Sequence, residues 1–183
     1  MRIIRGKYKT RNYGIPKKFP SRPTTDFAKE GLFNVLEHKL VLHDLRILDL
    51  CAGTGSISIE FLSREAGTVV AVDQNYNCVR HIQAMSKRFE CQDELLVYKQ
   101  EILRFLEKTT QTYDLIFADP PYEYAHHQRI AELVFERELL EEGGLLVIEH
   151  GKETDLSHIT HFDFVRTYGN VYFSFFQIDQ EDE

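Results

Sequence analysis

A regular alternation of apolar, β-rich runs with amphipathic segments constrains the fold of this chain more than any other feature. The β-rich runs lie at residues 46–50, 68–72, 95–99, 115–118 and 145–149, and the segments with helical periodicity between them lie at residues 56–64, 78–89, 102–108 and 129–140. Strands that are separated by helices pair in parallel, through right-handed crossovers. The alternation therefore predicts an α/β fold built on a parallel sheet of five strands.

The last part of the chain breaks this pattern. Residues 162–178 contain two β-rich runs joined by Gly169 and Asn170, with no room for a helix between them. Such runs form an antiparallel hairpin, because only an antiparallel pair can be closed by so short a turn. The sequence thus predicts seven strands, five parallel and two antiparallel, in one domain over residues 26–178.

Residues 1–25 form a separate region in front of the sheet. Ile3 and Ile4 open a short strand, a turn follows at residues 12–14, and three prolines keep the remainder extended. Thr25 is a suitable N-cap for the helix that follows, whose apolar residues share one face. We therefore expect a basic β-hairpin arm with an extended loop at residues 1–25, and an acidic tail at residues 179–183.

Positive charge is concentrated in this arm. The first 30 residues hold nine Lys or Arg against Asp26 and Glu30, which gives +7, and since the whole chain carries −7 the remainder carries −14. A basic segment with Tyr8, Tyr13 and Phe19 among its charges suits nucleic acid, through phosphate contacts and base stacking. A solvated, partly ordered terminus would give the same charge pattern.

Composition narrows the class of protein. With 183 residues, 43% of them hydrophobic and 28% charged, the chain is typical of a globular fold with a real core. We find no signal peptide and no apolar run near the roughly 20 residues of a membrane span. Cys51, Cys78 and Cys91 are odd in number and lack the spacing of a zinc site. We therefore expect a cytoplasmic monomer with no membrane partner and no metal.

The stretch DLCAGTGSIS at residues 49–58 closes a predicted strand, turns on Gly53 and Gly55, and opens a predicted helix. Turns of this type hold nucleotide cofactors at the end of a parallel sheet. A dinucleotide fingerprint would place a third glycine at Ser58, so pyrophosphate binding is disfavoured. Asp73 ends the next strand, where its carboxylate can accept hydrogen bonds from two ribose hydroxyls. A tight turn without a ligand is the alternative for the two glycines.

A second polar stretch, Asp119-Pro120-Pro121-Tyr122, ends another predicted strand. Proline cannot donate to a β-ladder and restricts the residue before it, so pairing must end by Pro120. A carboxylate and unpaired carbonyls, followed by an aromatic ring, suit a planar ring that carries an amino group. A strand end with a Pro-Pro turn is the alternative. Because ligands of open α/β sheets bind outside the carboxyl ends of the strands, Asp49, Asp73 and Asp119 should face one crevice.

Together these motifs resemble a class I S-adenosylmethionine-dependent methyltransferase with its Rossmann-like sheet. The resemblance rests on the Gly-Thr-Gly turn after Asp49, on Asp73, on Asp-Pro-Pro-Tyr at 119–122 and on the antiparallel ending. The pieces MRIIRGKYKTR, RPTTD and LFNVL further resemble the bacterial RsmD family, which methylates guanine N2 in 16S ribosomal RNA. This similarity covers almost the whole chain. It implies S-adenosylmethionine as cofactor and ribosomal RNA, in the assembled small subunit, as substrate.

The resemblance also implies roles for individual residues. The catalytic motif would be Asp119, Pro120, Pro121 and Tyr122. The cofactor would be bound by Asp49, Ala52, Gly53, Thr54, Gly55, Asp73, Gln74, Glu101 and Asp119. Glu101 stands near the adenine amino group where the family usually has Asp, and the extra methylene changes or removes that contact. The arm would contact RNA through Arg2, Arg5, Lys7, Lys9, Arg11 and Arg22.

The chemistry expected of such a site follows from the poor nucleophilicity of guanine N2, whose lone pair is delocalised into the ring. Asp119 and the Pro120 carbonyl would accept its two N–H bonds, localise the lone pair and aim it at the sulfonium methyl group. Tyr122 would stack on the base, and Asp119 or solvent would take the proton afterwards. A base within a helix must first be extruded.

Other functions are compatible with parts of this pattern. DNA adenine-N6 methylation uses the same four-residue motif, but sequence-specific DNA methylation calls for a target-reading segment, and this chain has only a compact arm beyond its core. A non-catalytic RNA-binding module would keep the fold without needing Asp73 and Asp119. An NAD-linked oxidoreductase is disfavoured by Ser58 and by the antiparallel ending.

Overall fold

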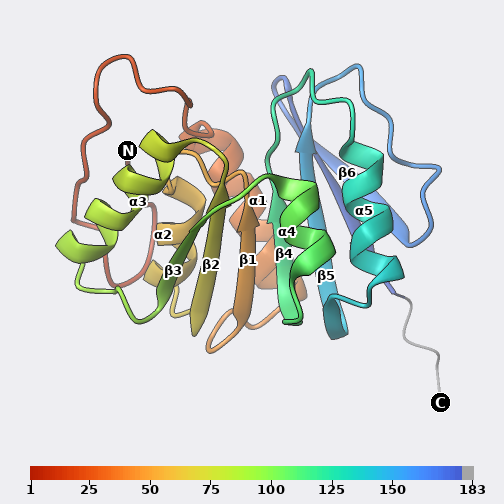
Figure 1. Ribbon diagram of the computed structural model, residues 1–183, viewed down its shortest axis with the longest axis horizontal. Helices are drawn as coiled ribbons and strands as arrows, with labels where there is room; N and C mark the ends of the chain where they lie inside the picture. The colour runs from red at the N-terminus through yellow and green to blue at the C-terminus, as the bar shows by residue number, and fades with distance from the viewer. Residues whose placement is uncertain (179–183) are drawn as a thin grey trace.

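The structure, a computed structural model, describes residues 1–178, and the predicted acidic tail at residues 179–183 lies outside them. Its helices and strands alternate along the chain as far as β5, and two more strands follow (Figure 1). In order they are α1 (Asp26–Lys39), β1 (Arg46–Leu50), α2 (Ser56–Ser63), β2 (Thr68–Asp73), α3 (Tyr76–Arg88), β3 (Leu95–Lys99), α4 (Ile102–Lys108), β4 (Tyr113–Ala118), α5 (His127–Glu136), β5 (Leu140–His150), β6 (Phe162–Tyr168) and β7 (Val171–Gln177). None of the helices within residues 1–178 has the length and apolar character that crossing a membrane requires.

The strands form one sheet in the order β3-β2-β1-β4-β5-β7-β6. Strands β1 to β5 are parallel, and β7 pairs antiparallel with both β5 and β6. Leu50 at the end of β1 lies beside Val72 and Ala118, so the three central strands end at one level. The strand order reverses between β1 and β4, and in open α/β sheets this switch point is where ligands bind.

Helices cover the two faces of the sheet unequally. Helices α1, α2 and α3 pack on one face and α4 and α5 on the other (Figure 1). Alternate residues of β1 pack into the cores on the two faces of the sheet, Ile47 on the α1–α3 face and Leu48 on the α4–α5 face. Because both faces are covered, the parallel strands are largely apolar. On the second face the edge strand β3 keeps Leu96 and Tyr98 exposed.

The predicted seven-stranded sheet with five parallel strands and an antiparallel ending is confirmed. One boundary was wrong, because the helix predicted at residues 129–140 ends at Glu136. Glu138 has a positive φ of 52°, and Leu140 then enters β5 by pairing with Tyr113. Strand β5 therefore includes the two glycines at 143 and 144, which we expected to precede it, with a register shift at this point.

The predicted amino-terminal hairpin is present in a reduced form. A single antiparallel bridge joins Arg2 and Asn12, and no continuous strand starts at Ile3. Ile3 is instead buried in the core on the α1 face. Gly6 has a φ of +92° and lies so close to α2 that a Cβ atom would come within 1.8 Å of the Ser63 carbonyl oxygen. The arm is therefore packed against the domain.

A buried ionic cluster fastens the arm to α1 and α2. The Glu60 carboxylate accepts hydrogen bonds from the Ile4 and Arg5 amides at 2.9 and 3.1 Å. It also pairs with Lys29 of α1 at 3.5 Å and with Arg64 at 2.9 Å. All three charged side chains are almost fully buried. Glu60 thus joins three segments that are remote in sequence.

Candidate active site

Three loops meet at the carboxyl ends of β1, β2 and β4. The Ala52 amide donates to the Val72 carbonyl at 3.0 Å, and the Asp119 amide donates to the Leu50 carbonyl at 3.1 Å. These bonds extend the strand pairing by one residue and hold the loops in register. The convergence of Asp49, Asp73 and Asp119 that the sequence predicted rests on this arrangement of strand ends.

The glycine turn after β1 adopts a conformation that few other residues tolerate. Gly53 and Gly55 have φ values of +56° and +76°, and a Cβ atom on Gly53 would lie 2.4 Å from the Ser21 hydroxyl oxygen. A Cβ atom on Gly55 would lie 2.7 Å from Cε of Met85. The turn is therefore pressed between α3 and the amino-terminal segment, and both glycines are needed to form the cradle.

Asp73 links two of the loops. One carboxylate oxygen accepts from the Gly53 amide at 2.9 Å, and the other accepts from the Asn75 amide at 2.8 Å. Each carboxylate oxygen has about two acceptor positions, so one position on each oxygen is left for a ligand. Two hydroxyls on adjacent carbons of a ribose match this pair. Gln74, next in the chain, is exposed at the same edge.

Asp49 is buried beneath the glycine turn and is held by a serine. The Ser58 hydroxyl donates to Asp49 at 2.5 Å. Burial raises the Asp49 pKa to about 7, and the Ser58 hydrogen bond opposes that rise. Ser58 stood out in the sequence only as the place of a missing glycine. Its contact with Asp49, nine residues away, gives it a positioning role that the sequence did not reveal.

Glu149 is a site residue that sequence reasoning missed. It lies on β5, is 4% exposed, and accepts from the Tyr122 hydroxyl at 3.2 Å and from the Thr24 hydroxyl at 3.4 Å. Burial raises its pKa to about 7, and burial beside Glu149 and Asp49 raises the Asp119 pKa well above its ordinary value. The signal was a glutamate inside the apolar run LLVIEH, because ionisable residues are rarely buried in strands without a reason.

The Asp-Pro-Pro-Tyr loop presents two acceptors and one ring. The Pro121 carbonyl accepts from the Tyr124 amide at 2.9 Å, whereas the Pro120 carbonyl has no hydrogen bond partner within residues 1–178. The Tyr122 ring packs on Gly151, where a Cβ atom would approach it to 2.9 Å, and 43% of the tyrosine is exposed. The loop therefore offers the Asp119 carboxylate, a free carbonyl and an accessible aromatic surface.

Three further predicted residues lie around this crevice. Ala52 is half-buried in the turn, and the buried Thr54 hydroxyl accepts from the Ser56 amide at 3.3 Å. Glu101 caps α4 by accepting from the Arg104 amide at 3.1 Å, and its second oxygen accepts from the Tyr124 hydroxyl at 3.1 Å. The longer side chain at this position therefore has two structural partners, and it links α4 to the Asp-Pro-Pro-Tyr loop through Tyr124.

The six arm residues predicted to contact RNA do not lie together. Arg22 is exposed and lines a pocket of about 20 Å³ with Asp49 and Asp119, so the end of the arm covers part of the crevice. Arg2 and Arg5 pair with Asp26 and Glu37 at 3.7 and 3.1 Å. The cations of Lys7 and Arg11 lie over aromatic rings, and Lys9 is exposed. Only Arg22 is thus beside the site.

The side chains that line the crevice show which kind of ligand it suits. Asp49, Asp73, Asp119 and Glu149 bring four carboxylates together, and within residues 1–178 none of them pairs with a cationic side chain. Such a site disfavours pyrophosphate and favours a ligand with positive charge. S-adenosylmethionine carries a sulfonium and an ammonium group together with a ribose, so the residues present fit this cofactor.

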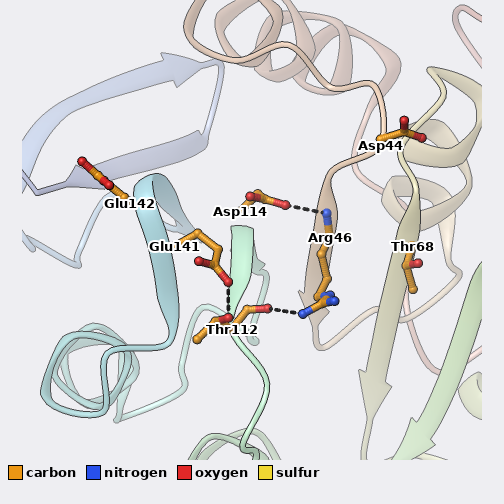
Figure 2. Close-up of a pocket in the computed structure, with 7 residues that line it drawn as sticks. All are labelled: Asp44, Arg46, Thr68, Thr112, Asp114, Glu141 and Glu142. Atoms are coloured by element: carbon orange, nitrogen blue, oxygen red, sulfur yellow. Dashed lines mark hydrogen bonds between the residues drawn. The ribbon is translucent and has the colours of Figure 1, made fainter.

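A larger pocket lies at the opposite end of the sheet, where the strands begin (Figure 2). Figure 2 shows the Arg46 amide donating to Asp114 and the Thr112 hydroxyl donating to Glu141. The Arg46–Asp114 bond is 2.7 Å long. Asp44 and Glu142 also line this pocket, which has a volume of about 400 Å³. It lies away from the switch point of the sheet, so we do not assign the cofactor to it.

Comparison with known proteins identifies the family of this chain. The family model described as Conserved hypothetical protein 95 matches residues 1–177. Ribosomal RNA small subunit methyltransferase D of Haemophilus influenzae is 30% identical, over 85% of this chain and 81% of its own length. The chain belongs to the RsmD family of methyltransferases. The solved structure of yhhF from Escherichia coli superposes on this RsmD-family chain with a TM-score of 0.86, at 22% identity over 99% of both chains.

A more distant solved structure shares the same fold. It is an RNA methyltransferase of Salinibacter ruber in complex with S-adenosyl-L-homocysteine, with a TM-score of 0.69 at 14% identity over 88% of this chain and 97% of the other. Membership of the RsmD methyltransferase family confirms the predicted cofactor, S-adenosylmethionine. Of the residues predicted to bind it, Asp49, Ala52, Thr54 and Asp119 line the carboxylate-lined crevice.

Proposed function

We propose that this protein transfers a methyl group from S-adenosylmethionine to the exocyclic N2 amine of a guanine in small-subunit ribosomal RNA, within the assembled subunit. Support comes from the relative of Haemophilus influenzae, whose name gives ribosomal RNA of the small subunit as its substrate. The observation that carries the proposal is the presence of two acceptors on neighbouring residues, the Asp119 carboxylate, which lines the crevice, and the unpartnered Pro120 carbonyl.

Two acceptors in this position suit a primary amine. An aromatic amine has two N–H bonds, and if both donate, its lone pair is localised and directed away from the acceptors, toward the crevice. S-adenosylmethionine, when bound, supplies an electrophilic methyl group. Positioning of this kind accounts for much of the rate of a transfer reaction, because the reacting atoms are held in line. Tyr122 provides the ring on which the base would stack.

Glu149 completes the site by controlling protons. Two adjacent carboxylates in a dry environment do not both ionise easily, so the Asp119–Glu149 pair retains a proton at higher pH than isolated carboxylates do. Asp119 must be ionised to accept from the amine, so the shared proton would have to move to Glu149 or leave the site when the amine binds. After transfer, the proton released by the methylated amine would pass to Asp119 or to solvent.

The experiment is a transfer assay with labelled S-adenosylmethionine and four acceptors: assembled small subunits, naked small-subunit RNA, large-subunit RNA and duplex DNA. Nucleosides from the labelled acceptor are separated and identified by mass spectrometry. We expect N2-methylguanosine, with small subunits as the best acceptor. Label found as N6-methyladenosine in duplex DNA would overturn the proposal in favour of DNA methylation.

A further inference from the structure

A groove runs along the exposed face of the sheet edge, between strand β3 and helix α4. Its floor contains Thr68, Val70, Leu96 and Tyr98, which share one face because Val70 pairs with Leu96 in register. Helix α4 and the loop that follows it form the wall. The volume is about 650 Å³, larger than that of the pocket in Figure 2. The groove exists because only α4 and α5 cover this face.

The charges of the groove are all of one sign. Its lining contains four cations and no carboxylate, and the cations are Arg46, Lys99, Arg104 and Lys108. In a domain where acids outnumber bases, this is an unusual composition. Within residues 1–178 none of the four forms an ion pair, although Lys39, Arg64 and Arg129 elsewhere in the domain do. The groove therefore attracts an anion that the protein itself does not supply.

Aromatic surface accompanies these cations. Tyr98 is 49% exposed, and its ring centroid lies 6.1 Å from that of Phe105. Tyr113 lies behind them with its side chain fully buried. The groove thus offers stacking surface beside the cations.

The two ends of the groove define its direction. At one end Lys99 and Gln100 precede Glu101, whose carboxylate accepts from Tyr124 of the catalytic loop. At the other end the Arg46 guanidinium is held by the Thr112 carbonyl at 3.4 Å, next to the acidic pocket (Figure 2). A polyanion that leaves the active site can follow the cations from Lys99 at the end of β3 past Arg104 and Lys108 of α4 to Arg46, and is repelled where the acids begin. Its path spans about five strand residues, or roughly 16 Å.

We propose that this groove binds a single-stranded segment of the RNA substrate, with phosphates on the cations and a base on Tyr98. The inference rests on the proposed function, which supplies an RNA, and adds a second contact surface on the domain itself. Single strands are held by this combination of a cationic track and exposed aromatic rings, whereas a small anion would need neither its length nor its aromatic floor.

The test compares two charge-matched variants. The groove variant carries Lys99→Gln, Arg104→Gln and Lys108→Gln, and the control variant carries Lys39→Gln, Arg129→Gln and Arg166→Gln, which lie on other elements. Binding of a short unstructured oligoribonucleotide is measured over a range of salt concentrations. Removing one phosphate contact lowers the salt slope for a single strand by about 0.7, so the slope of the groove variant should fall by about 2. The control should keep the wild-type slope.

Tyr98→Ala separates stacking from charge. We expect weaker oligonucleotide binding, by about tenfold, with an unchanged salt slope, because the ring carries no charge. Equal slopes and equal affinities for wild type, groove variant and control would overturn the inference, as would no measurable binding by wild type.

Methylation of small subunits by wild type is scored separately. Its absence would refute the proposed function, while a groove variant that methylates them with wild-type KM would refute the groove alone.

Discussion

At the scale of single residues, the proposed mechanism depends on which carboxylate near the crevice is ionised. In that mechanism Asp119 would accept from the amine, while Glu149 accepts from the Tyr122 hydroxyl. Asp49 and Asp73 are tied to Ser58 and to loop amides, so they shape the cofactor side. This division of roles makes different substitutions affect different measurements.

Asp119→Asn should remove methyl transfer without removing cofactor binding. The amide would present an N–H group where an acceptor is needed, and loss of such a transition-state contact costs about 100-fold or more in rate. Transfer is measured with labelled cofactor, and affinity for the cofactor by calorimetry. Glu123→Gln, four residues on and exposed, is the matched control and should be active. Wild-type turnover of Asp119→Asn would refute the mechanism.

Asp73→Ala should instead weaken the binding of the cofactor. The side chain would lose its bonds to two ribose hydroxyls, and a hydrogen bond to a charged group contributes about 1.5–3 kcal/mol. The substitution also frees the Gly53 and Asn75 amides, so we expect a loss at the upper end of this range. Calorimetry measures it directly. An unchanged Kd for the cofactor would show that its ribose does not bind at Asp73.

Glu149→Gln tests the proton held in the crevice. Because the folded-state pKa of Glu149 is about 7, above its unfolded value, the folded protein binds the extra proton and loses stability as pH rises toward 7. Gln does not titrate. The variant should therefore gain about 2 kcal/mol relative to wild type between about pH 5.5 and pH 8. Urea denaturation of both proteins at each pH gives this difference, and a pH-independent difference would show that Glu149 titrates normally.

At the scale of helices and strands, the sequence predicted well what depends on local patterns. The apolar β-rich runs became strands with nearly the predicted bounds, apart from the earlier start of β5 at Leu140. Thr25 caps α1 as expected, accepting from the Ala28 amide at 3.2 Å. The strand-end aspartates were predictable because their position follows from the periodicity. Ser58 and Glu149 were missed because the contact that defines each depends on folding, as between Thr24 and Glu149, 125 residues apart.

The ionic cluster that fastens the arm to α1 and α2 gives a prediction about stability. Glu60→Gln would leave the buried cations of Lys29 and Arg64 without their shared carboxylate, and removing one partner of a buried pair costs about 3–5 kcal/mol. Glu136→Gln removes one carboxylate of an exposed pair with Arg129 and should cost less than about 1 kcal/mol. Urea denaturation measures the free energy of unfolding of both variants. Equal losses of stability would show that the cluster does not secure the arm.

At the scale of the whole molecule, charge is distributed less simply than the sequence indicated. A net +7 in the first 30 residues against −14 beyond them made the arm the expected RNA contact. The structure pairs Arg2 and Arg5 of the arm with acids of the domain and, within that acidic domain, leaves four cations in one groove unpaired. Summed charge could not reveal this, because it ignores where side chains lie.

The arm remains the predicted primary contact with RNA, and five substitutions test it. Changing Arg2, Arg5, Lys7, Lys9 and Arg11 to Gln should raise the KM for RNA while cofactor affinity stays constant. Removing one phosphate contact lowers the salt slope of binding by about 0.7 to 0.9. Since Arg2 and Arg5 already have acidic partners, we expect the salt slope to fall by less than the sum for five phosphate contacts.

The same arm variant also tests substrate choice. A guanine in a folded ribonucleoprotein is displayed by its surroundings, so assembled small subunits should be better acceptors than naked RNA or duplex DNA. If the arm reads that surface, its loss should reduce the preference for small subunits over naked RNA. The ratio of kcat/KM values for the two acceptors measures this preference. Equal methylation of adenine in duplex DNA by wild type and arm variant would contradict both the substrate and the role of the arm.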